Sequence, residues 1–428
     1  MKTLTRPLAV LFSVVLFSAL FLSGCVFPVR RVSLDPNPNG PAAQVTGDAA
    51  VFTMPDPDGS APSAAASLPA VSDSFSASGI PVVSEPRLAV FWYAMADAHV
   101  FELREAFGPV LDSSGIPYRE YDAENDRRRQ TDQMREAADA GWNVFAVQLV
   151  VNGSIEFTRE ILDAAGDCPV IFFDRTPDPE QLPSLSPAES SRTALIRTDP
   201  AETGQVQGQM IGEFLLSHFS VSDLNQDGRI RYTFLVGDAD DPAALTLTRS
   251  ALDTANAILA QNGYRALSYL DEDNTVGWQA DPGGSWSSNA GTDIIRSDLG
   301  YYNYANSNMI ELIAANNDDM ALGALTALQS AWCNLGDGTS VTIPLFGLGG
   351  SPAALSAVGL GQMTGTVGCN AAAYAEAVLA VVRGLSACGS LDEALSAAAS
   401  GTDDCRPDDS HSSVLYITPV PVFSGSLP

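Results

Sequence analysis

Short apolar runs alternate with longer amphipathic segments between residues 88 and 418, and this alternation constrains the fold more than any other feature of the chain. Runs such as 144–150 and 230–236 are typical of buried strands. Longer segments such as 242–261 carry apolar residues at helical spacing. Strands that alternate with helices form parallel sheets covered on both faces. Because the units are too many for one sheet, the sequence predicts an α/β protein of two lobes, each a parallel sheet flanked by helices.

The individual elements follow from the same periodicity and from the Gly, Pro and Asx residues between the runs. The predicted strands are 88–93, 144–150, 169–173, 194–197, 230–236, 267–270, 311–315, 341–346, 365–367 and 414–418. The predicted helices are 100–111, 125–140, 154–165, 203–218, 242–261, 291–299, 318–331 and 371–385.

The N-terminus has the pattern of a processing signal. Lys2 and Arg6 precede an apolar run over 8–22, and small residues then lead to Cys25. This order is typical of a bacterial lipoprotein signal with a lipobox over 1–25. The alternative is a transmembrane anchor, for which the run is short. We expect Cys25 to be lipidated and the mature chain to be extracytoplasmic, in the periplasm or at the cell surface, anchored by lipid without spanning the membrane.

The segment 26–86 is rich in Pro, Ala and Ser and has little periodicity, so we expect a disordered tether. The chain has a net charge of −29, and Lys2 is its only lysine. Nucleic acid and anionic lipid headgroups need a basic face, so both are excluded as partners. An extracytoplasmic location permits disulfides, but whether Cys388 pairs with Cys405 stays open because sequence does not give connectivity.

The segment 223–231 has the spacing of a calcium loop. Asp223, Asn225 and Asp227 stand at positions 1, 3 and 5, and Gly228 follows at position 6. An EF-hand would place a glutamate at position 12, but Phe234 stands there and a strand pattern follows. The missing carboxylate must come from elsewhere in the chain; the alternative is an acidic turn without an ion.

Polar residues follow several predicted strands, and in open α/β sheets ligands bind at the carboxyl ends of the strands. Singly, each such residue is explained as a helix N-cap or a turn residue. Together they predict a crevice for a small polyhydroxylated ligand. These residues are Asp97, Gln148, Asp174, 238–241, 316–318, 349–350 and Asn370.

An ordered set of motifs over residues 88 to about 421 resembles the periplasmic glucose/galactose-binding proteins, the solute receptors of sugar ABC transporters. The motifs are Asp97 after the first strand, 170–175 (VIFFDR), Thr198-Asp199, the 223–231 loop, 315–318 (ANND), 343–347 (IPLFG) and 365–367 (GTV). The resemblance implies a type I periplasmic-binding fold with a hinge of three crossovers.

The expected crossovers lie near 174–175, over 367–370 and before Val414. The lobes would then be 88–174 plus 369–405 and 175–368 plus 410–421.

The same resemblance implies a structural Ca²⁺ ion that braces one lobe. Its ligands would be Asp223, Asn225, Asp227, the backbone oxygen of Arg229, and Glu311 from a distant strand. Where the family has a glutamine ligand this chain has Arg231, which has no acceptor atom, so we expect a weakened site in which water fills that position.

For the sugar, the resemblance assigns hydroxyl-binding roles to Asp97 and Asn317 and a stacking role to Trp286. His99 stands at the other stacking position, and Gln148 replaces an asparagine.

Other positions depart from the pattern. The family's His-Pro-Asp with an arginine reads Asp241-Pro-Ala with Leu247, Gly349 replaces an aspartate, and Cys369 replaces an asparagine, with Asn370 next to it. We keep Asp174, Asp241 and Asn370 as candidate pocket residues. The lost Asp–Arg pair removes hydrogen bonds worth about 1 kcal/mol or more each, which weakens glucose binding.

These observations predict a monomeric, lipid-anchored solute-binding protein that closes on a galactose- or glucose-like monosaccharide and docks on an ABC transporter permease, or on a chemoreceptor. The alternative is a sensor or surface-interaction lipoprotein whose altered pocket binds another ligand. A glycosidase using Asp97 with Asp241 is disfavoured, because no nucleophile–base pair is evident and His99, His218 and His411 are scattered. The sequence therefore predicts that the protein is not an enzyme.

Overall fold

The structure is a computed structural model that describes residues 83–306, 308–388, 390–401 and 404–423. The predicted signal with Cys25, and residues 26–82 of the predicted tether, lie outside the described residues. None of the described helices is long and apolar enough to cross a membrane.

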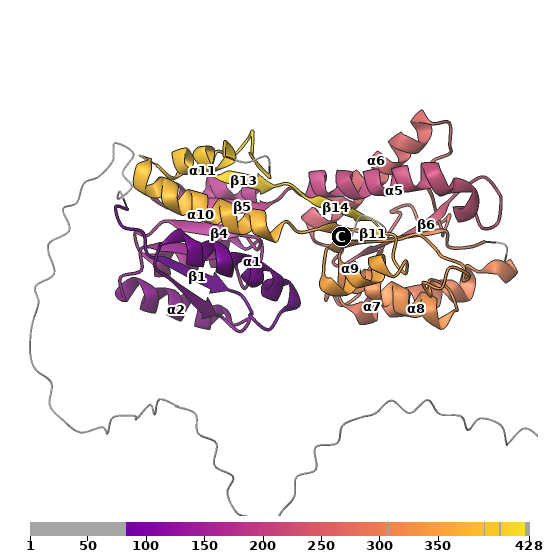
Figure 1. The fold of residues 1–428 in the computed structure, drawn as a ribbon, viewed down its shortest axis with the longest axis horizontal. Coiled ribbons are helices and arrows are strands. Elements are labelled where there is room, and N and C mark those ends of the chain that lie inside the picture. Colours follow the sequence, from indigo (N-terminus) through magenta and orange to yellow (C-terminus); the bar gives the residue numbers. More distant parts are fainter. Residues whose placement is uncertain (1–82, 307, 389, 402–403, 424–428) are drawn as a thin grey trace, which may run out of the picture. The chain divides into compact units, whose positions relative to one another are not determined.

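The first lobe is built on a seven-stranded sheet in the order β12-β13-β5-β4-β3-β1-β2. Its strands β1, β4, β5 and β13 are labelled in Figure 1. Its pairs are parallel except β12–β13. The strands are β1 (Leu88–Trp92), β2 (Tyr118–Asp122), β3 (Val144–Val147), β4 (Val170–Phe173), β5 (Thr193–Thr198), β12 (Cys405–Pro407) and β13 (Val414–Ile417).

Helices cover both faces of this sheet, and every residue of β1, β3 and β4 is buried as a result. One apolar core contains side chains of α1 (Ala98–Ser114), α10 (Ala371–Ala387) and α11 (Leu391–Ala399). The other contains those of α2 (Arg127–Asp139) and α3 (Ile155–Ala165). The short helices η1 (Pro179–Ser184) and α4 (Pro187–Ser190) connect β4 to β5.

The second lobe has its own sheet in the order β14-β11-β10-β9-β6-β7, and β8 also pairs with β6. Only β14 is antiparallel to its neighbour. The strands are β6 (Arg231–Val236), β7 (Ser268–Tyr269), β8 (Gln279–Ala280), β9 (Leu312–Ala315), β10 (Leu345–Gly349), β11 (Gly365–Gly368) and β14 (Val420–Phe423).

Two helix layers cover this sheet as well. The helices α5 (Pro200–Ser222) and α6 (Pro242–Gln261) share one core, and α7 (Ser288–Tyr301), α8 (Asp318–Ser330) and α9 (Pro352–Gly359) share the other. A Cβ atom at Gly204 would lie 2.3 Å from the backbone oxygen of Leu247, and one at Gly208 equally close to that of Ala251. These glycines therefore let α5 and α6 pack at backbone distance.

The predicted two-lobed α/β architecture is confirmed, but two of the predicted lobe boundaries are wrong. The strand β5 pairs with β4, with Ala194 opposite Ile171, and β13 pairs with β5, with Leu415 opposite Ile196. Both strands thus belong to the first lobe. The chain first crosses after Thr198, not near 174–175, because η1 and α4 return it to the sheet that it left.

The last crossing lies between β13 and β14, after Ile417 rather than before Val414. The middle crossing, between β11 and α10, falls within the predicted 367–370. The lobes are therefore 88–198 plus 371–417, and 200–368 plus 420–423. The five described cysteines are free, so Cys388 and Cys405 are not paired.

Candidate functional site

A cleft of 1460 Å³ is lined by residues of both lobes. Its first-lobe wall contains residues that follow β1 and β4, and its second-lobe wall contains residues that follow β6, β8 and β9, as expected for the carboxyl ends of parallel strands. Ligand pockets usually measure about 300–1,000 Å³, so this cleft has room to narrow around a small ligand.

A histidine–carboxylate pair forms part of the first-lobe wall. The Nε2 atom of His99 lies 3.1 Å from Oδ1 of Asp174, and Gln148 Nε2 donates to Asp174 Oδ2 at 2.9 Å. Burial alone would lower the pKa of His99, but the Asp174 carboxylate outweighs it and raises that pKa to about 9. Burial likewise opposes ionisation of Asp174, and His99 keeps the pKa of this carboxyl below its usual value. The position that resembled a stacking site therefore carries an imidazolium at neutral pH.

Beside this pair, Tyr93 presents an aromatic ring that was not predicted as part of the site. The Arg175 guanidinium lies over this ring, 4.1 Å from the ring centroid. The Nε and Nη2 atoms of Arg175 donate to the backbone oxygens of Leu149 and Val150 at 2.8 and 2.9 Å. Burial, and then a hydrogen bond to Asp97, raise the pKa of the Tyr93 hydroxyl. The only sequence signal that could have placed Tyr93 in the site was its position directly after the first strand.

Asp97 caps the helix that begins at this wall. Its Oδ1 accepts the N–H groups of His99 and Val100 at 2.9 and 3.2 Å. Asp241 has the same role in the second lobe, where its Oδ1 accepts the N–H of Ala243 at 2.8 Å at the start of α6. Each carboxylate thus lines the cleft while it fixes the first turn of a helix.

Trp286 and Asn317 form part of the opposite wall. The Trp286 ring lies against Gly237, where a Cβ atom would be 1.9 Å from Cδ2 of the indole. Asn317 Nδ2 donates to the backbone oxygen of Trp286 at 2.8 Å, and its Oδ1 accepts the N–H of Met320 at 2.9 Å. Asn317 therefore joins the Trp286 loop to the start of α8.

Asp318 explains why a side chain is missing at position 349. It is buried, its Oδ1 accepts the Thr366 hydroxyl at 2.7 Å, and its Oδ2 accepts the N–H of Ser351 at 2.7 Å. A Cβ atom at Gly349 would lie 3.1 Å from Asp318 Oδ2, and the φ angle of Gly349 is 135°. Asp318 thus lies in the space next to the position at which the resembled family has an aspartate.

Of the predicted pocket residues, Asp97, His99, Asp174, Asp241, Trp286 and Asn317 line the cleft. Two predicted residues do not. Gln148 is fully buried behind Asp174, and Asn370 caps α10 by accepting the N–H of Ala373 at 3.1 Å. The alternative explanation of strand-end residues as helix N-caps therefore holds for Asn370. Ligand binding by the six cleft residues stays a prediction.

Residues 88–389 match the family model of the periplasmic binding protein domain. The chain belongs to this family. The protein is 28% identical over 255 residues to the D-galactose/methyl-galactoside binding periplasmic protein of Haemophilus influenzae. The aligned region covers 59% of this chain and 67% of that relative. It is 23% identical over 260 residues to a putative rhizopine-binding protein of Rhizobium meliloti, with 60% of this chain and 70% of the relative covered.

Solved structures show the same fold. An ABC transporter periplasmic solute-binding protein from Actinobacillus succinogenes with bound D-allose superposes with a TM-score of 0.55 at 17% identity, over 80% of this chain and 98% of that one. The myo-inositol binding protein of Caulobacter superposes with a TM-score of 0.52 at 18% identity, over 79% and 93%. As the sequence predicted, the protein is a binding protein of the type I periplasmic fold and not an enzyme.

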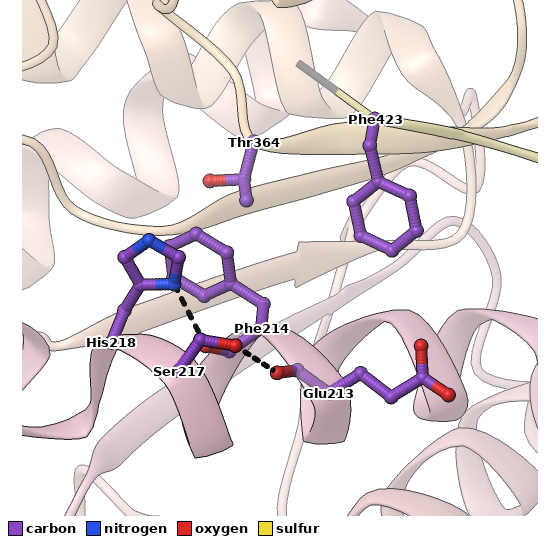
Figure 2. Close-up of a pocket in the computed structure, with 6 residues that line it drawn as sticks. All are labelled: Glu213, Phe214, Ser217, His218, Thr364 and Phe423. Atoms are coloured by element: carbon purple, nitrogen blue, oxygen red, sulfur yellow. Dashed lines mark hydrogen bonds between the residues drawn. The ribbon is translucent and has the colours of Figure 1, made fainter. Parts of the chain in front are cut away.

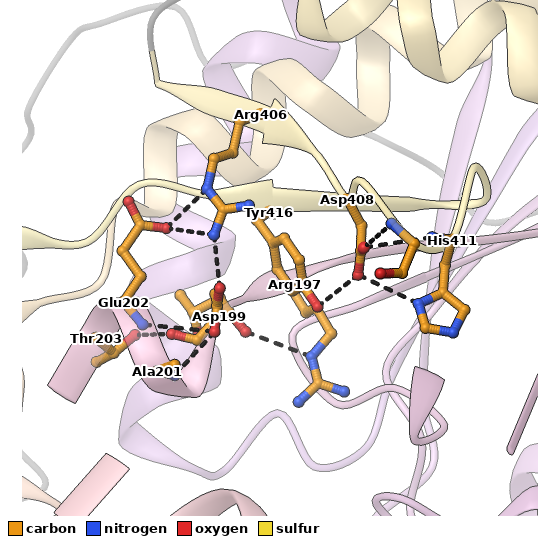
Figure 3. Close-up of polar contacts among 11 residues, drawn as sticks. Arg197, Asp199, Ala201, Glu202, Thr203, Arg406, Asp408, His411 and Tyr416 are labelled. Atoms are coloured by element: carbon orange, nitrogen blue, oxygen red, sulfur yellow. Dashed lines mark hydrogen bonds and ion pairs between the residues drawn. The ribbon is translucent and has the colours of Figure 1, made fainter. Parts of the chain in front are cut away.

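In this periplasmic binding protein, an ion-pair cluster joins the two lobes at the first crossover (Figure 3). Arg406 of β12 places Nη2 2.6 Å from Asp199 Oδ2 and 3.0 Å from Glu202 Oε2, at the N-terminus of α5. Next to it, Tyr416 donates its hydroxyl to Asp408 Oδ2 at 2.8 Å. Arg406 thus ties an edge strand of the first lobe to the helix that opens the second.

The predicted calcium loop meets Glu311, as the resemblance implied. Glu311 directly precedes β9 and is fully buried; its Oε1 accepts the N–H of Leu224 at 2.8 Å and its Oε2 that of Arg231 at 2.9 Å. The backbone N–H of Arg229 donates to Asp227 at 2.9 Å.

The loop residues fit an ion poorly, because Arg231 Nη1 lies 2.5 Å from Asp227 Oδ2. The guanidinium thus lies beside a predicted calcium ligand, at the position where a water ligand was expected. Among the residues that the structure describes, no three His, Cys, Asp or Glu side chains are arranged to hold a metal ion.

A smaller hollow of 390 Å³ lies between α5 and β14 of the second lobe (Figure 2). Phe214 and His218 stack with their ring centroids 4.3 Å apart, and Phe423 lies across from them. His218 Nδ1 is 3.0 Å from the backbone oxygen of Phe214, so this ring nitrogen has a hydrogen-bond partner within its own helix. The hollow shares no lining residue with the large cleft.

Proposed function

We propose that this protein captures a monosaccharide or a related polyol outside the cytoplasmic membrane and delivers it to the permease of an ABC transporter. The cleft is the observation that carries the proposal, because its walls combine aromatic rings with carboxylate and amide groups. Planar polar groups bind adjacent hydroxyls, and rings pack on the C–H face of a sugar. Relatives named for galactose, and structures with bound D-allose and myo-inositol, support this ligand class.

Capture proceeds by closure of the lobes about the three crossovers, and no bond is broken. Tyr93, Asp97 and His99 approach the ligand from the first lobe, and Trp286 and Asn317 from the second. The His99–Asp174 pair offers a charged donor where the resembled family has a stacking ring. Charge-assisted hydrogen bonds are the stronger ones, so this pair favours a ligand with a hydroxyl directed at it over one that offers only a C–H face.

The rest of the proposal concerns location and partners. Lipidation of Cys25 would hold the protein at the outer side of the membrane, and the closed form would dock on the permease or on a chemoreceptor. The family name, periplasmic binding protein, supports the extracytoplasmic location.

Isothermal titration with D-galactose, D-glucose, D-allose, L-arabinose and myo-inositol tests the ligand class. We expect saturable binding of at least one of them, weakened at least tenfold in Asp97→Ala and Trp286→Ala. The matched control for Trp286→Ala is Trp332→Ala, because Trp332 also lies in the second lobe, is 79% exposed and does not line the cleft. No binding across the panel by folded wild-type protein would overturn the sugar proposal and favour the sensor alternative.

A further inference from the structure

The 223–231 loop is held in its turn by its own side chains. Asp223 Oδ1 accepts the N–H of Asp227 at 3.1 Å, and its Oδ2 accepts that of Gly228 at 2.9 Å. Asn225 Oδ1 also accepts the N–H of Asp227 at 3.1 Å. Gln226 and Gly228 have φ angles of 59° and 73°, which a tight turn of this kind requires. The turn is therefore formed by hydrogen bonds within the protein.

Three carboxylates, those of Asp223, Asp227 and Glu311, meet at this turn and need a positive charge beside them. Asp223 is 9% exposed, Glu311 is fully buried, and the two are close enough to repel each other. Both oxygens of Glu311 accept backbone N–H groups, from Leu224 and Arg231. Hydrogen bonds from neutral donors reduce the cost of burying such charges, but buried charges are normally also paired with an opposite charge.

Arg231, at the first position of β6, supplies a positive charge to one of the three carboxylates, Asp227. Its Nη1 lies 2.5 Å from Asp227 Oδ2, and its side chain is only 14% exposed. Its neutral backbone N–H donates to Glu311 Oε2 at 2.9 Å, so the same residue also holds a second carboxylate in place. A guanidinium is always ionised and offers five donors and no acceptor.

We propose that the Arg231 guanidinium is the permanent cation of this loop and takes the place of a divalent ion, so that the second lobe is braced without calcium. Calcium needs about six to eight oxygen ligands. Arg231 offers no oxygen at its own position, and its guanidinium already binds one oxygen of Asp227, Oδ2. A divalent ion at the same carboxylates would also be repelled by the guanidinium next to it. The sequence-based prediction of a weakened calcium site is thus revised to a site that arginine occupies.

The test compares wild-type protein with Arg231→Gln, which restores an oxygen donor, in CaCl₂ and in EGTA. For the wild type we expect no heat of calcium binding and the same melting temperature in both buffers. For Arg231→Gln we expect calcium binding, with a rise of about 2–4 °C at a calcium concentration near five times the dissociation constant. The double variant Arg231→Gln/Glu311→Gln should lose this response.

Arg296→Gln is the control, because Arg296 pairs with Asp293 on the exposed face of α7 and makes no hydrogen bond to the carboxylates of the loop among the described contacts. A wild-type protein that binds calcium and melts higher in it would overturn the proposal, as would a folded Arg231→Gln variant that is indifferent to calcium. Should that variant fail to fold, the wild-type titration alone decides the question.

Discussion

His99 and Asp174 hold each other charged at the wall of the cleft, with Nε2 of the imidazole 3.1 Å from Oδ1 of the carboxylate. They belong to different strand ends of the first lobe, since His99 lies in the first turn of α1 and Asp174 follows β4. Asp174 has a φ angle of 58°, a left-handed conformation that non-glycine residues rarely adopt. The contacts with His99 and Gln148 hold its side chain, and its backbone N–H donates to the oxygen of Ile196 at 2.9 Å.

This pair predicts that stability falls at alkaline pH. Because the folded pKa of His99 is raised to about 9, its contribution is fully present below the unfolded value of about 6.5 and is lost as pH rises through 9. The imidazole is more than one third exposed, so we discount the shift for solvent screening and expect a loss of about 1 kcal/mol between pH 6.5 and 10. Urea unfolding at the two pH values measures it.

In Asp174→Asn this part of the pH dependence should disappear, because the histidine loses the charge that keeps it protonated. His218→Gln is the control, since His218 is exposed and stacks on Phe214 in the other lobe. An Asp174→Asn variant with the wild-type pH profile between 6.5 and 10 would show that the pair does not carry the effect.

The sequence predicted the alternation of strands and helices because burial on both faces of a sheet leaves nearly continuous apolar runs, as in β3 and β4. It did not predict which sheet each strand joins, since β5 and β13 have the same apolar pattern whichever sheet they enter. Edge strands such as β2, with the sequence YREYD, were missed because they alternate polar and apolar residues. Strand pairing depends on packing that periodicity does not record.

The site was predicted unevenly for a related reason. Strand-end positions such as Asp97 and Asn317 were found because topology brings them together. Gln148 was assigned to the pocket, but it lies behind Asp174, since a strand-end position does not give the direction of its side chain. Tyr93 and Arg175 were missed because their pairing joins two strand ends that lie far apart in the sequence.

Gly237→Ala should displace the Trp286 ring. A Cβ atom there would overlap the indole at 1.9 Å, so either the ring or the backbone must move. We expect a loss of about 1–3 kcal/mol in the free energy of unfolding and weaker ligand binding, as for overpacking. Gly108→Ala is the matched control, because no atom lies within 4 Å of its added Cβ in α1, and it should be neutral or stabilising. Equal effects of the two substitutions would contradict this view of the Trp286 wall.

Glu311→Ala should destabilise the second lobe with or without calcium. The substitution leaves the backbone N–H groups of Leu224 and Arg231 without their acceptor, so the 223–231 loop loses the hydrogen bonds that join it to the residue preceding β9. We expect a loss of roughly 2–4 kcal/mol. Urea unfolding in EGTA measures it, with the exposed Glu105→Ala as control. A loss below about 0.5 kcal/mol, typical of surface substitutions, would show that Glu311 does not hold the loop.

Arg406→Ala should change ligand affinity although Arg406 does not line the cleft. Its ion pairs with Asp199 and Glu202 connect the lobes at a crossover, so their loss alters the balance between open and closed forms. The direct loss of stability should be about 1 kcal/mol or less, because the Arg406 side chain is 43% exposed. Arg296→Ala, which breaks an ion pair within α7, should leave affinity unchanged. The two variants are compared by isothermal titration, and identical affinities would refute a hinge role for Arg406.

Small-angle X-ray scattering of the wild-type protein, with and without a sugar that binds by titration, tests capture by lobe closure most directly. The predicted result is a smaller radius of gyration at saturating sugar, with no change in Trp286→Ala at the same concentration. A radius of gyration that stays constant while the wild-type cleft is saturated would contradict closure, and with it the proposed hand-over of a trapped sugar to a transporter.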